Sequence, residues 1–220
     1  MFESTKAHTL FPTFCWQHDL PATEAERLNR KLDAAVEALL TPRPALPPGH
    51  TFQTSQDLHQ RPQFAELVQL IHLAGSGVIS FLKLVHQAFE ITGCWANINP
   101  PGAPHAIHAH PNNLLSGVYY VKAGSGAEQI TFYDPRPQAR VIAPKHSEGT
   151  IANSSQSMID VKPGRMIIFP AWLEHSVPVN QSGQERMSIS FDLMPSDFTR
   201  MVSPPKWKGL GVNERSEIKS

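Results

Sequence analysis

Apolar residues follow two different periods along this chain, and the period changes near residue 94. In the segments 21–40 and 62–88, leucine, isoleucine, valine and alanine recur every three to four residues. This spacing is typical of amphipathic helices, so we expect one helix in each segment. The segment 41–50 lies between them and contains four prolines. It is predicted to be a loop, because proline interrupts helices.

Two local signals refine these helices. Thr23 and Glu26 stand three residues apart near the start of the first segment, which predicts a capping box at the helix N-terminus. Gly75-Ser76-Gly77 stands inside the second segment, where two glycines are expected to kink or split the helix.

From about residue 94, apolar and polar residues alternate with the period of two that is typical of β-strands. Turn sequences rich in proline, glycine and asparagine separate eight candidate strands: 94–99, 105–110, 114–122, 128–133, 157–161, 165–170, 175–179 and 185–193. Eight short strands joined by turns predict a double-sheet jelly roll, a mainly β, cupin-like fold. The segment 134–156 is expected to be a long excursion between strands.

We therefore expect a single domain over residues 1–220. Residues 1–90 would form an N-terminal helical elaboration that buttresses the β core, and 91–195 would form that core. Residues 196–220 contain two prolines and two glycines before a charged end, and are predicted to be a loop-like tail.

Charge and cysteine content exclude several classes of protein. Lysine plus arginine equals aspartate plus glutamate at 19 each, so the formal net charge is zero. That balance argues against a general electrostatic grip on nucleic acid or on an anionic membrane. Two cysteines do not make a disulfide framework. Neither a signal peptide nor a run of about 18 apolar residues is evident, so we expect a soluble, reducing, cytoplasmic setting.

Three histidines carry the candidate chemistry. His108 and His110 stand two residues apart on a predicted strand, so their side chains are expected to point to the same face. His175 begins a distant predicted strand and could close a triangle around one metal ion. Imidazole suits iron, zinc, copper or nickel, and three protein ligands leave coordination positions open for catalysis. The competing interpretation is that these are hydrogen-bonded histidines of the barrel without a metal.

Six sequence motifs occur in a fixed order over residues 94–193. They are Trp95-Ala96-Asn97-Ile98, His108-Ala109-His110-Pro111, Ser116-Gly117-Val118-Tyr119-Tyr120-Val121, Asp134-Pro135-Arg136, Pro163-Gly164 with Phe169-Pro170-Ala171-Trp172-Leu173-Glu174-His175, and Glu185-Arg186-Met187-Ser188-Ile189-Ser190-Phe191. Together they resemble a bacterial and phage branch of the 2-oxoglutarate/Fe(II) oxygenases. The resemblance implies a double-stranded β-helix with Fe(II) near one open end, 2-oxoglutarate as cosubstrate and dioxygen as oxidant.

The resemblance also implies a metal-ligand set. His108 takes the first histidine position and His175 the distal one. His110 falls where the superfamily's His-x-Asp motif has a carboxylate, which is a departure from the pattern. Two other first shells stay open at this point. In one, His110-Pro111-Asn112 is the His-x-Asp equivalent and Asn112 supplies an amide oxygen; in the other, a carboxylate such as Asp134 or Glu174 completes the shell.

The resemblance further implies a cosubstrate site built on the last strand. Arg186 stands where the superfamily uses a basic residue to hold the far carboxylate of 2-oxoglutarate, and a guanidinium matches a carboxylate in a bidentate geometry. Ser188 faces the same side and would support the same group. Strand alternation places Tyr120 in the barrel interior, and the resemblance implies a cosubstrate-binding tyrosine there; the alternative is a core aromatic with a satisfied hydroxyl. Asn97 and Asn99 share one face of the first core strand, and would bind cosubstrate or substrate or else act as buried structural amides.

These observations predict an Fe(II)/2-oxoglutarate dioxygenase that hydroxylates an unactivated C–H bond and releases succinate and carbon dioxide. Its substrate would be a small molecule or a peptide, with no nucleic acid or membrane partner, and homo-oligomerisation stays open. One alternative is a three-histidine cupin-type iron dioxygenase that does not use 2-oxoglutarate, in which Arg186 and Ser188 have no assigned task. The other is a non-enzymatic jelly-roll binding module.

Overall fold

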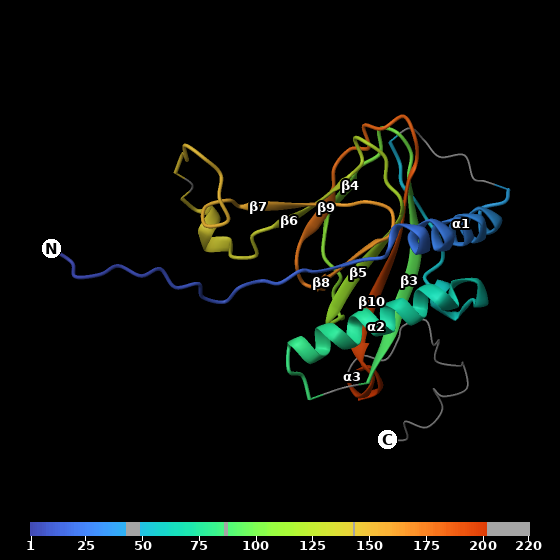
Figure 1. Ribbon diagram of the computed structural model, residues 1–220, viewed down its shortest axis with the longest axis horizontal. Helices are drawn as coiled ribbons and strands as arrows, with labels where there is room; N and C mark the ends of the chain where they lie inside the picture. The colour runs from blue at the N-terminus through green and yellow to red at the C-terminus, as the bar shows by residue number, and fades with distance from the viewer. Residues whose placement is uncertain (43–48, 86–87, 143, 202–220) are drawn as a thin grey trace, which may run out of the picture.

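The computed structural model describes residues 1–42, 49–85, 88–142 and 144–201. Ten strands form two antiparallel sheets within these ranges (Figure 1). The six-stranded sheet has the order β1 (Trp16–Asp19), β8 (Arg165–Pro170), β5 (Leu115–Lys122), β10 (Arg186–Pro195), β3 (Phe89–Asn99) and β2 (Phe52–Gln53). The four-stranded sheet has the order β4 (His105–His108), β9 (His175–Val177), β6 (Gln129–Tyr133) and β7 (Gln156–Asp160).

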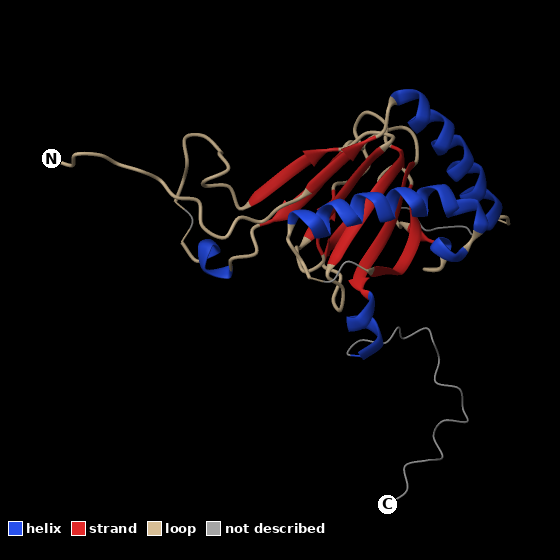
Figure 2. Ribbon diagram, turned by 60° about the horizontal axis from the view of Figure 1, so that its bottom comes forward, coloured by secondary structure: helices blue, strands red, loops and turns tan. Residues whose placement is uncertain are grey.

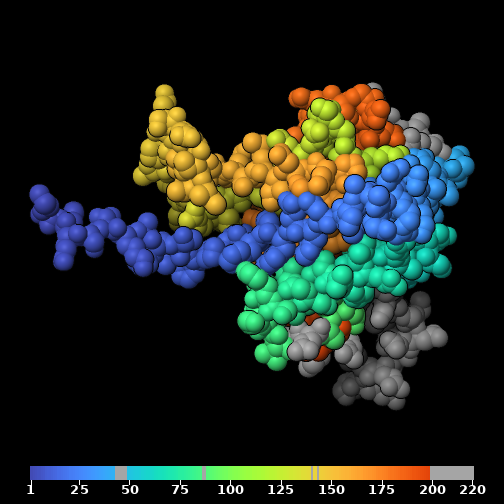
Figure 3. Space-filling model, viewed as in Figure 1, coloured from blue at the N-terminus to red at the C-terminus, as the bar shows by residue number. Residues whose placement is uncertain are grey.

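The strands β3 to β10 form the predicted jelly roll, a double-stranded β-helix. Two helices, α1 (Ala22–Leu39) and α2 (Ala65–Phe81), cover the outer face of the six-stranded sheet (Figure 2). Three short 3-10 helices lie in the connections: Leu58–Gln60, Pro62–Phe64 and Pro137–Arg140. Residues 1–14 are exposed and extend away from the body in the same direction as the excursion 134–156 (Figure 3).

The apolar residues divide into two layers on either side of the large sheet. One cluster lies between the helices and the sheet and includes Leu28, Leu32, Ile71 and Ile189. A smaller cluster lies between the two sheets and is built from the second set of alternating strand positions: Val118, Tyr120, Ile130, Phe132, Val161, Ile167, Phe169 and Leu173. The central strands β8, β5, β10 and β3 of the large sheet are therefore mostly buried on both faces, whereas the edge strands β1 and β2 have exposed positions.

Strand alternation sends the two adjacent tyrosines of β5 to opposite sides of this sheet. Tyr119 packs in the helix-side cluster, where its hydroxyl donates to Asn29 at 2.8 Å. Tyr120 packs in the cluster between the sheets. The predicted inward direction of Tyr120 is thus confirmed, because no bulge interrupts β5 over this pair.

All eight predicted strands are present, with ends that differ by a few residues from the expected ones. The two additional strands, β1 and β2, were not predicted. They contain four and two residues, which is too short for a periodic pattern to show. Their place in the sheet comes from pairing with β8 and β3.

The predicted capping box is wrong. Helix α1 begins at Ala22 directly after Pro21, and no side chain caps it. Thr23 therefore lies inside the first turn, where its hydroxyl has no N-cap role. Pro21 fits this place because it sets an extended backbone before the first turn, and its carbonyl accepts the bond from Ala25 N at 2.9 Å.

The predicted kink in the second helix is also wrong, because α2 runs without interruption through Gly75. A Cβ at that position would lie 2.8 Å from the ring of Phe89 and 3.0 Å from Leu193. The glycine therefore lets the helix approach β3 and β10 closely, and it does not break the helix.

Three segments were predicted to lack regular structure: the loop 41–50, the excursion 134–156 and the tail 196–220. Within the tail 196–220, residues Ser196–Met201 form the short helix α3, so the loop prediction is wrong there. The rest of the tail lies outside the described residues. The loop 41–50 also falls mostly outside them, because residues 43–48 are not described. The expected excursion 134–156 has no strand among its described residues up to 155, and its last residue, Gln156, already belongs to β7.

One helical stretch, Pro62–Phe81, is long and apolar enough to cross a membrane by length and composition, with a mean hydropathy of 1.4. It is not a continuous apolar run, because Glu66, Gln69 and His72 interrupt it. Its buried residues, among them Leu67, Ile71 and Val78, belong to the helix-side cluster against the large sheet. This packing is typical of the core helix of a globular domain.

Candidate metal and cosubstrate site

Three histidines from two distant parts of the chain converge at one end of the small sheet. His108 ends β4 and His175 begins β9, and the antiparallel register pairs these two residues directly. His110 lies two residues beyond the end of β4, where its backbone N–H donates to Ala171 O at 2.8 Å. Each of the three rings offers a nitrogen, and these nitrogens lie within 4.8 Å of one another. The centroid separations are 4.3 to 5.3 Å.

Each ring is oriented by a hydrogen bond from its Nδ1. His108 Nδ1 lies 2.8 Å from Ala106 O, and His175 Nδ1 lies 3.0 Å from Leu173 O. His110 Nδ1 lies 3.0 Å from Asp192 Oδ1. Carbonyl and carboxylate oxygens only accept, so each Nδ1 carries the hydrogen and donates it. With each Nδ1 committed to an oxygen, Nε2 is the atom of each ring that is left for a metal, which is the arrangement that metal-binding histidines adopt.

Burial favours the neutral form of two of these imidazoles, those of His108 and His175. It lowers the pKa of His175 to about 3 and lowers the pKa of His108 as well, because a charged imidazolium loses its hydration there. Neutral imidazole is the form that binds a metal. The residues present therefore fit a resident metal ion by their donor type and orientation.

A fourth histidine borders this group and was missed in the sequence. His105 begins β4 and stacks on His108 with ring centroids 4.4 Å apart. Burial lowers the pKa of His105 to about 4, yet its ring is not a member of the converging group. Its position three residues before His108 on the same predicted strand was the available signal.

The other first shells considered for the metal receive no support from the geometry. Asn112 is exposed and lies in the turn after His110, with φ of 66°. Asp134 forms an ion pair with Arg136 at 2.8 Å. Within the described ranges, neither Asp134 nor Glu174 belongs to the group of converging ligand atoms.

Arg186 is the second notable feature between the sheets. It is only 2% exposed, and its Nη1 donates to Gln129 O at 3.3 Å. Its guanidinium lies 5.1 Å from the ring centroid of Tyr120. Burial lowers the pKa of Arg186, but a guanidinium keeps its charge in proteins. Among the described residues, Arg186 Nε and the Tyr120 hydroxyl are buried without a hydrogen-bond partner.

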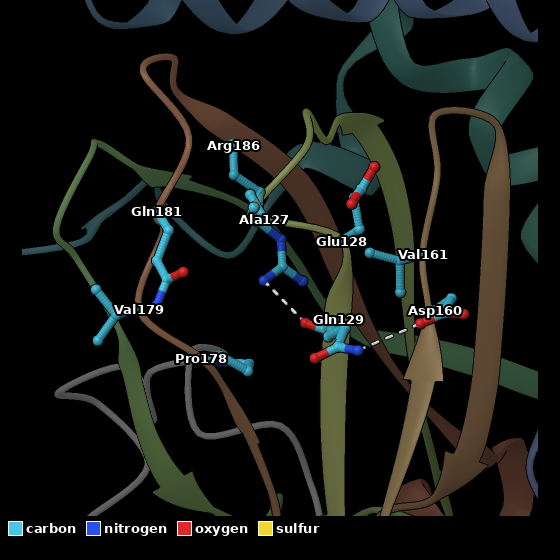
Figure 4. A pocket seen from close by; sticks show the side chains of 10 residues that line it. Ala127, Glu128, Gln129, Asp160, Val161, Pro178, Val179, Gln181 and Arg186 are labelled. Atoms are coloured by element: carbon cyan, nitrogen blue, oxygen red, sulfur yellow. Dashed lines mark hydrogen bonds between the residues drawn. The ribbon is translucent and has the colours of Figure 1, made fainter.

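The Arg186 side chain reaches into a cavity of about 430 Å³ (Figure 4). Gln129, Asp160, Val161, Pro178 and Gln181 are among the residues that line it. A buried cation with an unsatisfied Nε at the wall of a cavity is suited to an anionic ligand, because such a group costs free energy until it is paired.

The remaining predicted cosubstrate residues occupy neighbouring positions. Ser188 is buried on β10, and the register places it beside Asn97 of β3 and Tyr120 of β5. Asn97 already donates to Ser190 Oγ at 2.9 Å and accepts from Gln53 at 2.8 Å. Asn99 donates to Thr51 Oγ1 at 2.6 Å. These bonds give both asparagines a structural task, and their binding role stays a prediction.

Comparisons with known proteins agree with this geometry. Residues 93–192 match the model of a family described as "Putative 2OG-Fe(II) oxygenase". The fold is similar to a prolyl-4-hydroxylase from Pseudomonas putida, with 18% identity, a TM-score of 0.57, and 83% of this chain and 92% of that one covered. It is also similar to HygX from Streptomyces hygroscopicus, solved with nickel and 2-oxoglutarate, with 13% identity, a TM-score of 0.56, and 84% and 83% covered.

A third similar structure is the alpha-ketoglutarate-dependent epimerase SnoN from nogalamycin biosynthesis, with 13% identity, a TM-score of 0.59, and 83% and 78% covered. At such identities the likeness to solved structures establishes the fold, which is the double-stranded β-helix. No curated protein sequence matches the chain.

Proposed function

We propose that this chain is a 2-oxoglutarate/Fe(II) oxygenase, in which His108, His110 and His175 hold the iron and Arg186 holds the cosubstrate. The orientation of the three rings carries this proposal. Each Nδ1 is committed to an oxygen acceptor, so three Nε2 atoms are left to face one centre. Histidines that only filled the barrel interior would not be expected to have all three Nδ1 atoms bonded to oxygens and all three Nε2 atoms left over.

Each of this chain's residues has a definite task in the proposed reaction. The three imidazoles would hold the metal ion. Arg186 binds the far carboxylate of 2-oxoglutarate through its planar fork, and its unsatisfied Nε is part of that fork. Ser188 and Tyr120 supply hydroxyls on the neighbouring strand positions. Iron and 2-oxoglutarate, when bound, supply the dioxygen chemistry that side chains cannot.

We propose hydroxylation of an unactivated C–H bond, with release of succinate and carbon dioxide, as the outcome. The solved prolyl-4-hydroxylase of the same fold supports a hydroxylase. The family acts with dioxygen on a small-molecule or peptide substrate. A cytoplasmic setting is supported by Cys15 and Cys94, which are both free thiols. The zero net charge supports a partner other than nucleic acid.

Anaerobic spectroscopy tests the proposal directly. Addition of Fe(II) and then 2-oxoglutarate to the protein should produce a weak visible charge-transfer band, and dioxygen should release succinate. His175→Ala should lose the band, whereas replacement of the exposed His146 by alanine should leave it unchanged. A wild-type protein that binds iron but shows neither band nor succinate would contradict the proposal.

Three neutral ligands also favour a second candidate, a cupin-type iron dioxygenase without cosubstrate. In that enzyme the buried Arg186 would have no ligand to pair with, although it reaches into a cavity. Oxidation of a substrate with iron but without added 2-oxoglutarate would support this second candidate.

A further inference from the structure

We infer that Asp192 is a positioning residue for the metal, and that through its contact with His110 it supplies the negative charge which a metal-bound carboxylate supplies in the His-x-Asp pattern. This inference rests on the proposed function, because it assumes that His110 binds iron. It concerns a residue outside the metal-ligand and cosubstrate sets described above.

The contacts of Asp192 separate His110 from the other two histidines. His108 and His175 donate to backbone carbonyls, which are neutral acceptors. His110 Nδ1 instead lies 3.0 Å from Oδ1 and 3.3 Å from Oδ2 of the Asp192 carboxylate. A carboxylate acceptor raises the basicity of the imidazole that donates to it, and so strengthens the bond from Nε2 to a metal. Of the three rings, His110 therefore has the strongest donor atom.

This ring is also the one that departs from the family pattern. His110 stands where the His-x-Asp motif has its carboxylate, so three imidazoles alone would leave the iron without an anionic ligand. Asp192 restores one negative charge on the other side of the same ring. The charge lies in the second layer of contacts around the metal, and His110 connects the two.

The burial of Asp192 is a second reason to expect a cation on the His110 side of this carboxylate. Asp192 is only 7% exposed, and burying a carboxylate without a compensating positive charge costs free energy. Among the described residues its hydrogen-bond partners are the Ser116 hydroxyl, at 2.5 Å, and His110. No described ion pair joins it to a lysine or arginine. A metal ion on His110 Nε2 would provide the missing positive charge.

The fold holds Asp192 in this place from several sides. It lies on β10 with the same inward phase as Arg186, opposite Ser116 of β5. The pairing of β10 with β3 shifts register between Asp192 and Leu193, and such bulges re-aim side chains near active sites. Trp95 stacks on the His110 ring at 5.6 Å, which fixes the ring plane against the carboxylate. One strand thus carries the arginine for the cosubstrate anion and the aspartate for the metal cation.

Metal affinity of Asp192→Asn tests the inference with Co(II) as an oxygen-stable probe. The amide keeps the size of the carboxylate and removes its charge. We expect the dissociation constant for Co(II) to rise about 10- to 100-fold, the usual cost of losing a carboxylate behind a metal-bound histidine. Asp19→Asn is the matched control, because Asp19 pairs with Arg165 at the outer edge of the large sheet. It should bind Co(II) as the wild type does.

A spectroscopic shift separates positioning from a merely structural role. In Asp192→Asn loaded anaerobically with Fe(II) and 2-oxoglutarate, the charge-transfer band should move to shorter wavelength, because a poorer donor set makes the iron less electron-rich. Asp192→Glu should return the band toward the wild-type position. A purely structural role predicts a weaker band at an unchanged wavelength, and that result would overturn the inference.

The outcomes distinguish the two proposals. Equal Co(II) affinity of wild type and Asp192→Asn, with binding lost in His110→Ala, would reject the role of Asp192 and leave the proposed function intact. Equal affinity of wild type and His110→Ala would reject both. If Asp192→Asn does not fold, the Zn(II)-loaded wild type decides: its NMR spectrum should contain a slowly exchanging His110 Nδ1–H proton, and absence of that proton would overturn the inference.

Discussion

Replacement of Arg186 by methionine should abolish tight cosubstrate binding without a matching loss of stability. Methionine fills a similar volume between the sheets and carries no charge. In the metal-loaded protein, 2-oxoglutarate would lose the cation that holds its far carboxylate. In the ligand-free protein, the same change removes a buried cation whose Nε has no partner among the described residues. The loss of 2-oxoglutarate affinity should therefore be large, whereas the free energy of unfolding of the ligand-free protein should change little or increase.

The magnitude follows from the burial of the guanidinium. Arg186 is 2% exposed, so its pairing with a carboxylate would be shielded from water. Removing one partner of such a buried pair costs about 2 to 5 kcal/mol. At about 1.4 kcal/mol per tenfold change, the dissociation constant for 2-oxoglutarate should rise roughly 30- to 3000-fold. Replacing a buried charge by a well-packed apolar side chain is often neutral or stabilising.

Anaerobic calorimetric titration of the Co(II)-loaded protein with 2-oxoglutarate measures the first effect, and urea unfolding of the metal-free protein measures the second. Arg30→Met is the control, since Arg30 is exposed on α1 and pairs only with Glu26 among the described ion pairs. Arg186→Lys should fall between wild type and Arg186→Met, because it keeps the charge and loses the fork. Unchanged 2-oxoglutarate affinity in Arg186→Met would refute the assignment of the cosubstrate site.

Three further outcomes are expected. Gly117→Ala should lower the free energy of unfolding by about 1 to 3 kcal/mol through overpacking, because its Cβ would clash with the ring of Phe191. Gly77→Ala is the control, because a Cβ there has nothing within 4 Å, and it should raise the free energy of unfolding by up to about 1 kcal/mol. Urea unfolding measures both changes. Burial lowers the pKa of His18 below its ordinary value near 6.5, so the unfolded state binds more protons. The free energy of unfolding should therefore fall as pH drops below that value. His18→Gln should reduce this dependence on pH, and an equal dependence in both proteins would contradict the lowered pKa of His18. Chelation of the metal should lower the unfolding midpoint, since a ligand at 100 times its dissociation constant stabilises by about 2.7 kcal/mol; a midpoint unaffected by metal or chelator would contradict a resident ion.

The sequence predicted the β core well because its strands carry their own periodic signal. Alternation places Tyr120 between the sheets and Tyr119 under the helices, and both follow from counting positions along β5. The convergence of His108 with His175 needed one more step, the resemblance to a known family. The register of β4 with β9 then brings the two residues opposite each other.

Other features depend on contacts between distant segments and leave little local trace. Gly75 resembles a helix breaker in the sequence, yet its role is set by the ring of Phe89 that packs against it. Asp192 stands in phase with Arg186 on the last strand, which was the available signal. Its meaning appears only when the fold brings it to His110, 82 positions earlier in the chain. Strand β1 is defined by pairing with β8 rather than by its own four residues.

A crystal structure of the protein with Co(II) and 2-oxoglutarate bound would test the central claim most directly. The account predicts one ion, located by anomalous scattering, bonded to Nε2 of His108, His110 and His175, with the far carboxylate of the cosubstrate on Arg186. An ion bound elsewhere, or one that exchanges the His110 ring for a carboxylate, would contradict it.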